Sequence, residues 1–424
     1  MTTMIEPATE LVGPSELRVN GTVTKEPRDE VTREFDAVVL AIGAAAHRGK
    51  VCGLTLAERG RRLAVKAGAA RVVVVDSPQL AATLPAWAIR GRDVLILRAS
   101  DQVVHFPLID AVRGGGARIA VTPEGEYAGA IWVPTADVAD VLAALAADSG
   151  DAGLAGRWRE SKHAIEHVHG EIARHRAVTR AERRAATKML FELVHKKDQD
   201  GFLSKYLFRP VAYPITRLFL PTPITPNGVT FIVALLAIGG CVIVAGASYE
   251  AAVIGSMMQH IAGYFDCTDG EIARLRHEGS RFGQWFDTLT DEATTIAYLL
   301  GIGIHVYQRH PEYQMYIAWS LPIGVAGSLV SLYVIYYYLI KVARSGNSQD
   351  YPVKKGGKLE PLAQLLHRDF IGLVVFVMAI ANITEIAYIG LCLGAVVSAL
   401  VLIPEHIKLR KDLASGAIVP RAWS

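Results

Sequence analysis

Four aspartates with regular spacing are the residues of this sequence best suited to chemistry. Asp266 and Asp269 stand at the end of one apolar segment, and Asp287 and Asp291 stand at the start of the next. Residues three or four positions apart share one face of a helix, so each segment would present two carboxylates on one side. Ionisable groups in apolar segments are costly to bury and usually serve a function.

The spacing predicts one shared cation site. If the two faces meet, four carboxylates converge, and carboxylates so close cannot all stay ionised without a cation. A ligand set made only of oxygen suits Mg²⁺ or Mn²⁺. The small residues Gly270, Ala273 and Gly283 leave room for a ligand. Arg274 is placed to pair with a phosphate. These groups together favour phosphoryl-group chemistry over carboxylates that only cap helix ends.

The pattern resembles the signature of the CDP-alcohol phosphotransferases, D-x2-D-G-x2-A-R-x8-G-x3-D-x3-D. Every fixed position of that signature is present between Asp266 and Asp291. The resemblance extends from about Asp200 to Leu409. It includes the segment from Thr225 to Thr230, which looks like the family's entry into its first transmembrane helix.

The resemblance implies a role for each of these residues. Asp266, Asp269 and Asp287 would bind the metals. Asp291 would complete the metal site and act as general base on the acceptor hydroxyl. The residues that would frame the CDP moiety are Asn227, Thr230, Gly270, Ala273, Arg274 and Gly283. The resemblance also implies a CDP-alcohol donor, Mg²⁺ or Mn²⁺ as cofactor, and a homodimer.

The second half of the sequence is apolar enough to cross a membrane repeatedly. The chain is 51% hydrophobic and only 20% charged, and one crossing needs about 20 apolar residues. The segments that we expect to cross are 228–247, 251–265 with the motif, 285–307, 314–340, 370–384 and 386–404. We therefore expect an all-α domain of six transmembrane helices over residues 227–411. An amphipathic helix over 201–226 would lie in the membrane interface.

Lysine and arginine predict the orientation of this domain. They are concentrated at 274–281, at 341–368 and from 408 to 411, whereas Arg309 is the only basic residue between Tyr307 and Gln314. This distribution places both termini, the soluble part and the aspartates on the cytoplasmic side of an inner (cytoplasmic) membrane. Arg368 starts the fifth segment, and a similar Arg-Asp pair occurs in relatives that use inositol phosphate. It is a candidate acceptor-binding residue, although a positive-inside anchor explains it nearly as well.

Residues 35–150 have the pattern of a soluble α/β domain. Apolar runs at 37–42, 71–75, 94–97 and 118–121 alternate with helical stretches at 54–66 and 107–113, which predicts a doubly wound, Rossmann-like domain with parallel strands. Its opening from Val38 to Gly43 resembles the sugar-phosphate nucleotidyltransferases, in which a glycine-rich loop cradles the nucleotide phosphates. The fused arrangement is similar to that of bifunctional inositol-phosphate cytidylyltransferase and phosphotransferase proteins.

The loop of this domain departs from the nucleotidyltransferase pattern. Residues 43–50 lack the second glycine and the Pro-Lys segment, and Asp101 is a single carboxylate that would match the metal-binding aspartate. We therefore expect a degenerate domain that has lost nucleotidyl transfer. A bifunctional enzyme with an active cytidylyltransferase domain is the alternative.

Two further segments flank the α/β domain. Residues 1–34 are polar and without apolar period, which predicts a disordered tail. Residues 151–200 read as a basic helical linker suited to an anionic membrane surface. Four residues of this segment recur at every fourth position and would present a zinc-binding face on a helix, although we favour a solvated helix. These residues are His163, His167, Glu171 and His175.

The sequence thus predicts an integral-membrane transferase of phospholipid biosynthesis. It would move a phospho-alcohol group from a CDP-alcohol to a hydroxyl acceptor and release CMP. The acceptor is left open among a polyol, a polyol phosphate and a lipid, with inositol-type chemistry favoured. Membrane lipid is an expected partner and nucleic acid is not. The competing class is a non-enzymatic membrane protein that binds or transports cations, which would not need the fixed glycines, alanine and arginine.

Overall fold

The chain divides into two compact units, which are described separately. Residues Met1–His195 and Leu275–His277 form the first unit, and residues Lys196–Arg274 and Glu278–Ser424 form the second. The computed structural model describes residues 34–114, 116–122, 127–148, 174–194, 204–346 and 368–421, with short pieces at 18–19, 22–23, 151, 154, 156, 166–168 and 350–351. Of the tail expected at 1–34, only Glu34 and the paired strands β1 (Arg18–Val19) and β2 (Thr22–Val23) are described.

The first unit is built on a six-stranded mixed sheet with the order β11-β9-β10-β7-β3-β6. Its strands are β3 (Phe35–Leu40), β6 (Arg71–Val75), β7 (Asp93–Arg98), β9 (Arg118–Val121), β10 (Tyr127–Val133) and β11 (Glu166–Val168). Strand β3 pairs in parallel with β6 and with β7, so that Ala37 lies between Val72 and Leu95. Strand β10 runs antiparallel to both of its neighbours.

The four strands expected to be parallel run in one direction, but they belong to a mixed sheet. Strand β9 runs in the same direction as β7, as expected, but the two are not neighbours. Strand β10 lies between them and places Ile131 opposite Ile96 and Ile119. The sequence of β10 is rich in β-branched and aromatic residues and fits a buried strand. The unit is thus an α/β domain in which one reversed strand interrupts the parallel order.

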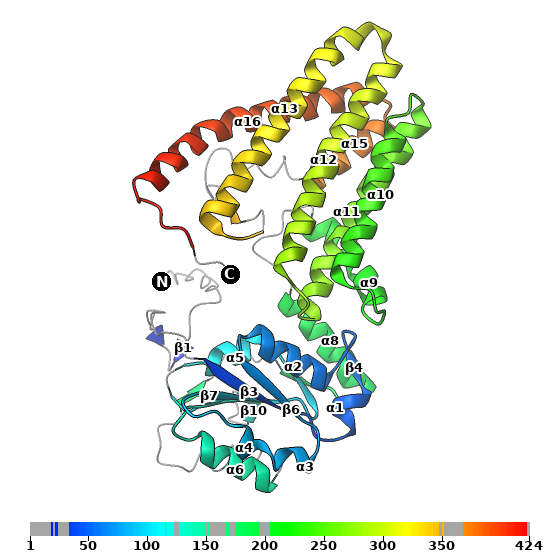
Figure 1. Ribbon diagram of the computed structural model, residues 1–424. Helices are drawn as coiled ribbons and strands as arrows, with labels where there is room; N and C mark the ends of the chain where they lie inside the picture. Colours follow the sequence, from blue (N-terminus) through cyan, green and yellow to red (C-terminus); the bar gives the residue numbers. More distant parts are fainter. Residues whose placement is uncertain are drawn as a thin grey trace, which may run out of the picture. The chain divides into compact units, whose positions relative to one another are not determined.

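Helices cover both faces of this sheet (Figure 1). On one face lie α2 (Leu56–Lys66) and α5 (Phe106–Val112), and on the other α3 (Pro78–Ala81), α4 (Leu84–Trp87) and α6 (Val138–Asp148). The core of the second face contains Val38, Ile96 and Leu142, all fully buried. On the first face, α2 lies so close to β3 that a Cβ at Gly60 would stand 2.7 Å from Val39 Cγ1. The helices expected at 54–66 and 107–113 correspond to α2 and α5.

Of the described residues in the segment 151–200, where a helix is expected, Leu154, Gly156 and the helix α8 (Arg180–Val194) are helical. Thr179 and Glu182 cap the start of α8, because each side chain accepts a hydrogen bond from the other residue's backbone N–H. Upstream, β11 pairs with β9, and β12 (Arg174–Arg176) pairs with β8 (Gln102–Val104) in a separate sheet. His167 and His175 therefore lie in strands of two different sheets, and no helix presents them together. His163 and Glu171 lie outside the described residues.

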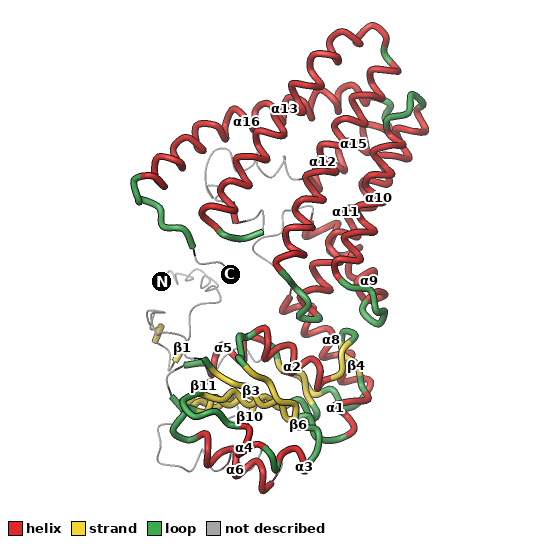
Figure 2. Tube along the Cα trace, viewed as in Figure 1, coloured by secondary structure: helices red, strands yellow, loops and turns green. Residues whose placement is uncertain are grey.

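The second unit is helical (Figure 2). A π-helical turn at Ser204–Phe208 leads into α9 (Arg209–Phe219), the expected amphipathic helix. The six expected membrane segments correspond to the helices α10 (Pro226–Val244), α11 (Tyr249–Leu275), α12 (Arg281–Arg309), α13 (Gln314–Tyr338), α15 (Arg368–Ile380) and α16 (Thr384–Ala414). Within the described residues, three stretches are long and apolar enough to cross a membrane, namely Pro226–Val244, Pro311–Ala343 and Thr384–Ala414.

Small residues allow the helices of this unit to pack closely. A Cβ at Gly255 of α11 would stand 2.5 Å from the Val244 nitrogen of α10. A Cβ at Gly301 of α12 would stand 2.6 Å from the Cys241 carbonyl oxygen, also in α10. A Cβ at Gly327 of α13 would stand 2.9 Å from the Ala395 carbonyl oxygen of α16. Close backbone approach at small residues is typical of helix packing in membranes, and here it sets α11 and α12 against the same helix.

One buried histidine predicts a pH dependence of the first unit. Burial, followed by the nearby charge of Arg59, lowers the pKa of His105 from 6.5 to about 4. Between these values the unfolded chain binds a proton that the folded chain does not. The contribution of His105 to stability should therefore be full above pH 6.5 and fall by about 3 kcal/mol as the pH drops to 4. Calorimetric unfolding of the full chain across this range measures the slope. His105→Asn should reduce it, and a stability that is flat between pH 6.5 and 4 would contradict the assignment.

Candidate metal and phosphotransfer site

The aspartates of the motif are positioned by two helices. Asp266 and Asp269 belong to α11, and Asp287 and Asp291 belong to α12. Helix α12 starts directly after Ser280, whose hydroxyl accepts a 2.9 Å hydrogen bond from the Gly283 N–H. A side-chain cap of this kind fixes where the helix begins. The helix start therefore determines which face of α12 carries Asp287.

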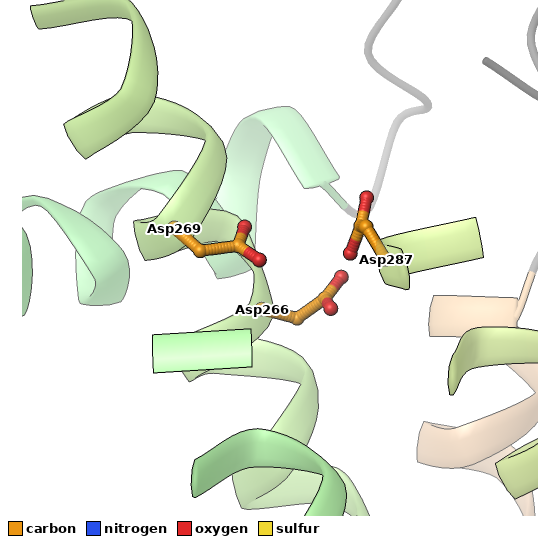
Figure 3. Close-up of side chains that lie close together, drawn as sticks. All are labelled: Asp266, Asp269 and Asp287. Atoms are coloured by element: carbon orange, nitrogen blue, oxygen red, sulfur yellow. The ribbon is translucent and has the colours of Figure 1, made fainter. Parts of the chain in front are cut away.

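Three carboxylates come together between these helices. Oxygen atoms of Asp266, Asp269 and Asp287 all lie within 4.8 Å of one another. Figure 3 shows the three side chains directed toward a common point. Asp269 is buried, whereas Asp266 and Asp287 are partly exposed. Carboxylates this close repel one another unless a cation lies between them. The donor set is all oxygen and partly open, so these residues fit a hard divalent cation such as Mg²⁺ or Mn²⁺.

Hydrogen bonds fix the most buried of these carboxylates. The Thr230 hydroxyl donates to one oxygen of Asp269, and the Gly270 N–H donates to the other. Donors on both oxygens favour the ionised form and fix the carboxylate plane, as outer-shell partners of metal ligands do. Thr230 belongs to the first turns of α10, which begins after the N-cap Thr225. The segment from Thr225 to Thr230 thus lies beside the motif.

Two glycines of the motif make room for polar side chains. A Cβ at Gly283 would stand 2.8 Å from Asn227 Oδ1, and a Cβ at Gly270 would stand 3.1 Å from Arg274 Nη1. A larger side chain at either position would displace an amide or a guanidinium that can donate to phosphate. The residues expected to frame the CDP moiety therefore sit at three places, which are the start of α10 (Asn227, Thr230), the end of α11 (Gly270, Ala273, Arg274) and the start of α12 (Gly283).

Asp291 has a different environment from the group of three. It lies one turn beyond Asp287 on α12 and lines a mainly apolar pocket with Gln259, Thr294 and Tyr298. Its backbone carbonyl accepts the Thr294 hydroxyl at 3.0 Å and the Thr295 hydroxyl at 2.8 Å. Its carboxylate is therefore placed at the border between the clustered aspartates and this pocket. Arg368 begins α15, but the position of its side chain lies outside the described residues.

Glu271 is a residue of the motif region that sequence reasoning missed. It is fully buried, and its carboxylate accepts from Arg209 Nη1 at 2.9 Å and from the Thr216 hydroxyl at 2.6 Å. Both partners belong to α9, so the interfacial helix is fixed to the motif helix next to Asp269. The signal was present in the sequence, because an acid inside an apolar helix needs a buried partner. The sequence does not say which basic residue supplies it.

The candidate nucleotide loop of the first unit has a closed structure. A short helix, α1 (Ala44–Arg48), occupies the loop, with Ala46 fully buried and His47 Nε2 2.9 Å from the Ala41 carbonyl oxygen. Asp101 is engaged by both nitrogens of the Arg98 fork, with Nε–Oδ1 at 2.8 Å and Nη2–Oδ2 at 2.9 Å. Each oxygen of the Asp101 carboxylate thus accepts one hydrogen bond from this bidentate arginine.

Comparison with known proteins finds a family similar to the part of the chain that carries these features. Residues 223–401 match the model of the family described as CDP-alcohol phosphatidyltransferase. A bifunctional IPC transferase and DIPP synthase from Aquifex aeolicus is 30% identical over 121 residues, which is 28% of this chain and 27% of that protein. The chain therefore spans about a quarter of the length of that relative. A phosphatidylinositol phosphate synthase from Corynebacterium glutamicum is 24% identical over 186 residues, which is 44% of this chain and 79% of that protein.

A solved structure is also similar in part. The crystal structure of the phosphatidylinositol phosphate synthase of Mycobacterium tuberculosis, in complex with manganese and citrate, is 17% identical with a TM-score of 0.36. The matched region covers 46% of this chain and 88% of the chain in that crystal structure. The family match contains all eight fixed positions of the aspartate motif and the helices that carry them. Residues 223–401 are therefore similar to the CDP-alcohol phosphatidyltransferase family over a region that includes the whole aspartate motif.

Proposed function

We propose that this chain is an integral-membrane CDP-alcohol phosphotransferase that uses Mg²⁺ or Mn²⁺. The observation that carries the proposal is the convergence of Asp266, Asp269 and Asp287 within 4.8 Å inside the matched domain. When bound, a divalent cation would neutralise charge on the pyrophosphate of the donor. Asp266, Asp269 and Asp287 would hold it, and Asn227, Thr230 and Arg274 would orient the CDP moiety by hydrogen bonds and charge.

The proposed reaction transfers the phospho-alcohol group in one displacement. The oxygen of the acceptor hydroxyl forms a bond to the phosphorus that carries the alcohol, and the bond from that phosphorus to the bridging oxygen of CMP breaks. CMP leaves with the electron pair of that bond. The carboxylate of Asp291 takes the proton of the hydroxyl, because it lies next to the cluster and borders a pocket where an acceptor can approach.

We infer an inositol-type substrate from the relatives. Those with related sequences include a phosphatidylinositol phosphate synthase and a bifunctional IPC transferase and DIPP synthase. Arg368 stays the candidate ligand for an acceptor phosphate. We propose six crossings from the apolar segments. The basic residues of the loops support an orientation with both termini and the aspartates on the cytoplasmic side of an inner membrane. A homodimer stays an expectation of the family resemblance.

The roles of two aspartates can be separated by experiment. A positioned general base contributes about 10²–10⁴-fold, so Asp291→Asn should lower single-turnover CMP release by that order and leave donor affinity within a few-fold. Asp269→Asn should weaken donor binding as well, because the pyrophosphate would be held through the cation. Calorimetry of CDP-alcohol binding beside CMP release measures both variants, with wild type as the control. Equal loss of donor binding in both variants would make Asp291 chiefly a metal ligand.

Absence of CMP release by wild type across a panel of CDP-alcohols and acceptors would contradict the proposed function itself.

We also propose that the α/β unit no longer transfers nucleotides. The support is the Arg98 fork on Asp101 and the short helix α1 in the loop. The full chain with CTP, Mg²⁺ and a polyol phosphate should therefore release no pyrophosphate, which a coupled phosphate assay measures. Arg98→Gln would free Asp101 and serves as the matched variant. Pyrophosphate formed by the wild type above the no-enzyme control would instead support the bifunctional alternative.

A further inference from the structure

The end of the motif helix belongs to the α/β unit. Helix α11 carries Asp266 and Asp269 and ends at Leu275. Leu275, Arg276 and His277 are part of the first compact unit, although the residues on either side belong to the second. We call Leu275–His277 the motif cap. Asp269 lies less than two helical turns before the motif cap on the same helix.

The motif cap has the geometry of a helix terminus. His277 has a left-handed backbone with φ of 56°, and the Glu278 N–H donates to the Ala273 carbonyl at 2.9 Å. This is the hydrogen bond of a Schellman ending, in which glycine is the usual left-handed residue. The last carbonyls of a helix have no partner within the helix. The carbonyl oxygens of Leu275 and Arg276 therefore need hydrogen-bond donors from outside the helix.

Two arginines of α2 supply these donors. Arg59 Nη1 donates to the Leu275 carbonyl at 2.8 Å, and Arg62 Nη1 donates to the Arg276 carbonyl at 3.2 Å. Arg59 is only 1% exposed, and its Nη2 donates to the Val51 carbonyl at 2.8 Å. Cations at the C-terminus of a helix are also favoured by the helix dipole. A fully buried guanidinium is costly, and packing of α2 on the sheet alone would be served by an apolar side chain at this position.

The side chain of the left-handed residue is held by the same unit. The His277 ring lies 5.6 Å from the ring of His105 and 5.4 Å from that of Phe106, the latter edge to face at 84°. Burial lowers the pKa of His277 to about 2, so the ring is neutral at physiological pH. A neutral aromatic ring in this packing offsets the strain of a left-handed backbone in a residue other than glycine.

We propose that Arg59 is a positioning residue, which acts along α11 on Asp266 and Asp269 through the Leu275 carbonyl at the end of that helix. The expected effect of Arg59 on catalysis rests on the proposed function. Helix ends fray when their carbonyls lack donors. A frayed last turn would loosen the α11 backbone near Asp269, whereas catalytic groups need to stay within a fraction of an ångström of their productive positions.

The test compares two arginines of one helix in the full chain. Arg59→Met removes the cap donor and keeps most of the side-chain volume. Arg61→Met is the matched control, because Arg61 is 46% exposed and pairs with Glu58 at 2.8 Å. Hydrogen exchange is followed at residues 270–278 and at β3, and kcat and KM are measured for CMP release.

We expect Arg59→Met to speed exchange at 270–278 about tenfold and to lower kcat by a similar factor. Exchange at β3 should stay unchanged and KM within about twofold. Arg59→Lys should restore part of kcat, and Arg61→Met should match wild type.

The other possible results of this experiment each decide the proposal. Faster exchange at β3 as well as at 270–278 would show that Arg59 only stabilises the α/β unit, and a loosened cap with unchanged kcat would remove its positioning role. Either result overturns the proposal. If Arg59→Met does not fold, Arg62→Ala carries the same test, and it should show the same pattern with a smaller effect. If wild type releases no CMP, the proposed function fails, and the exchange experiment alone still supports or overturns the cap.

Discussion

Repulsion among three carboxylates is the constraint on which the structure of the helical unit depends. Asp266, Asp269 and Asp287 approach within 4.8 Å, and bringing like charges so close in a partly buried place costs free energy. The arrangement is stable only if a cation offsets the repulsion and the backbones that carry the side chains are held firmly. The first condition points to a hard divalent ion. The second explains much of the surrounding structure.

Backbone support comes from several directions. Helices α11 and α12 both pack on α10, because their glycines lie against the α10 backbone at Val244 and Cys241. Its first turns also carry Thr230, which donates to Asp269. Helix α9 is tied to α11 by the buried pair of Arg209 and Glu271. The Leu275 and Arg276 carbonyls at the end of α11 accept hydrogen bonds from Arg59 and Arg62 of α2.

The sequence predicted the parts of this structure that depend on local pattern. Helical spacing was sufficient to place two carboxylates on α11 and one beside them on α12. Apolar runs located the helices α10, α11, α12, α13, α15 and α16. The missed features depend on which distant residues meet. Strand β10 reads as an apolar run, yet nothing local says that it enters the sheet between β7 and β9. The partners of Glu271 and of the Leu275 carbonyl lie 62 and 216 positions away in the chain. Residues 151–200 were expected to be helical because of their charges, but β11 and β12 gain sheet hydrogen bonds from β9 and β8.

Binding of Mn²⁺ to the purified chain tests the metal site most directly, without substrate or turnover. Titration with Mn²⁺, followed by its electron paramagnetic resonance signal, reports the bound and free ion. We expect saturable binding by wild type that Mg²⁺ displaces, and a loss of affinity of at least tenfold in Asp266→Asn and in Asp287→Asn. Asp350→Asn, outside the motif, should bind Mn²⁺ as wild type does. Wild-type affinity in both motif variants would contradict a metal site formed by these carboxylates.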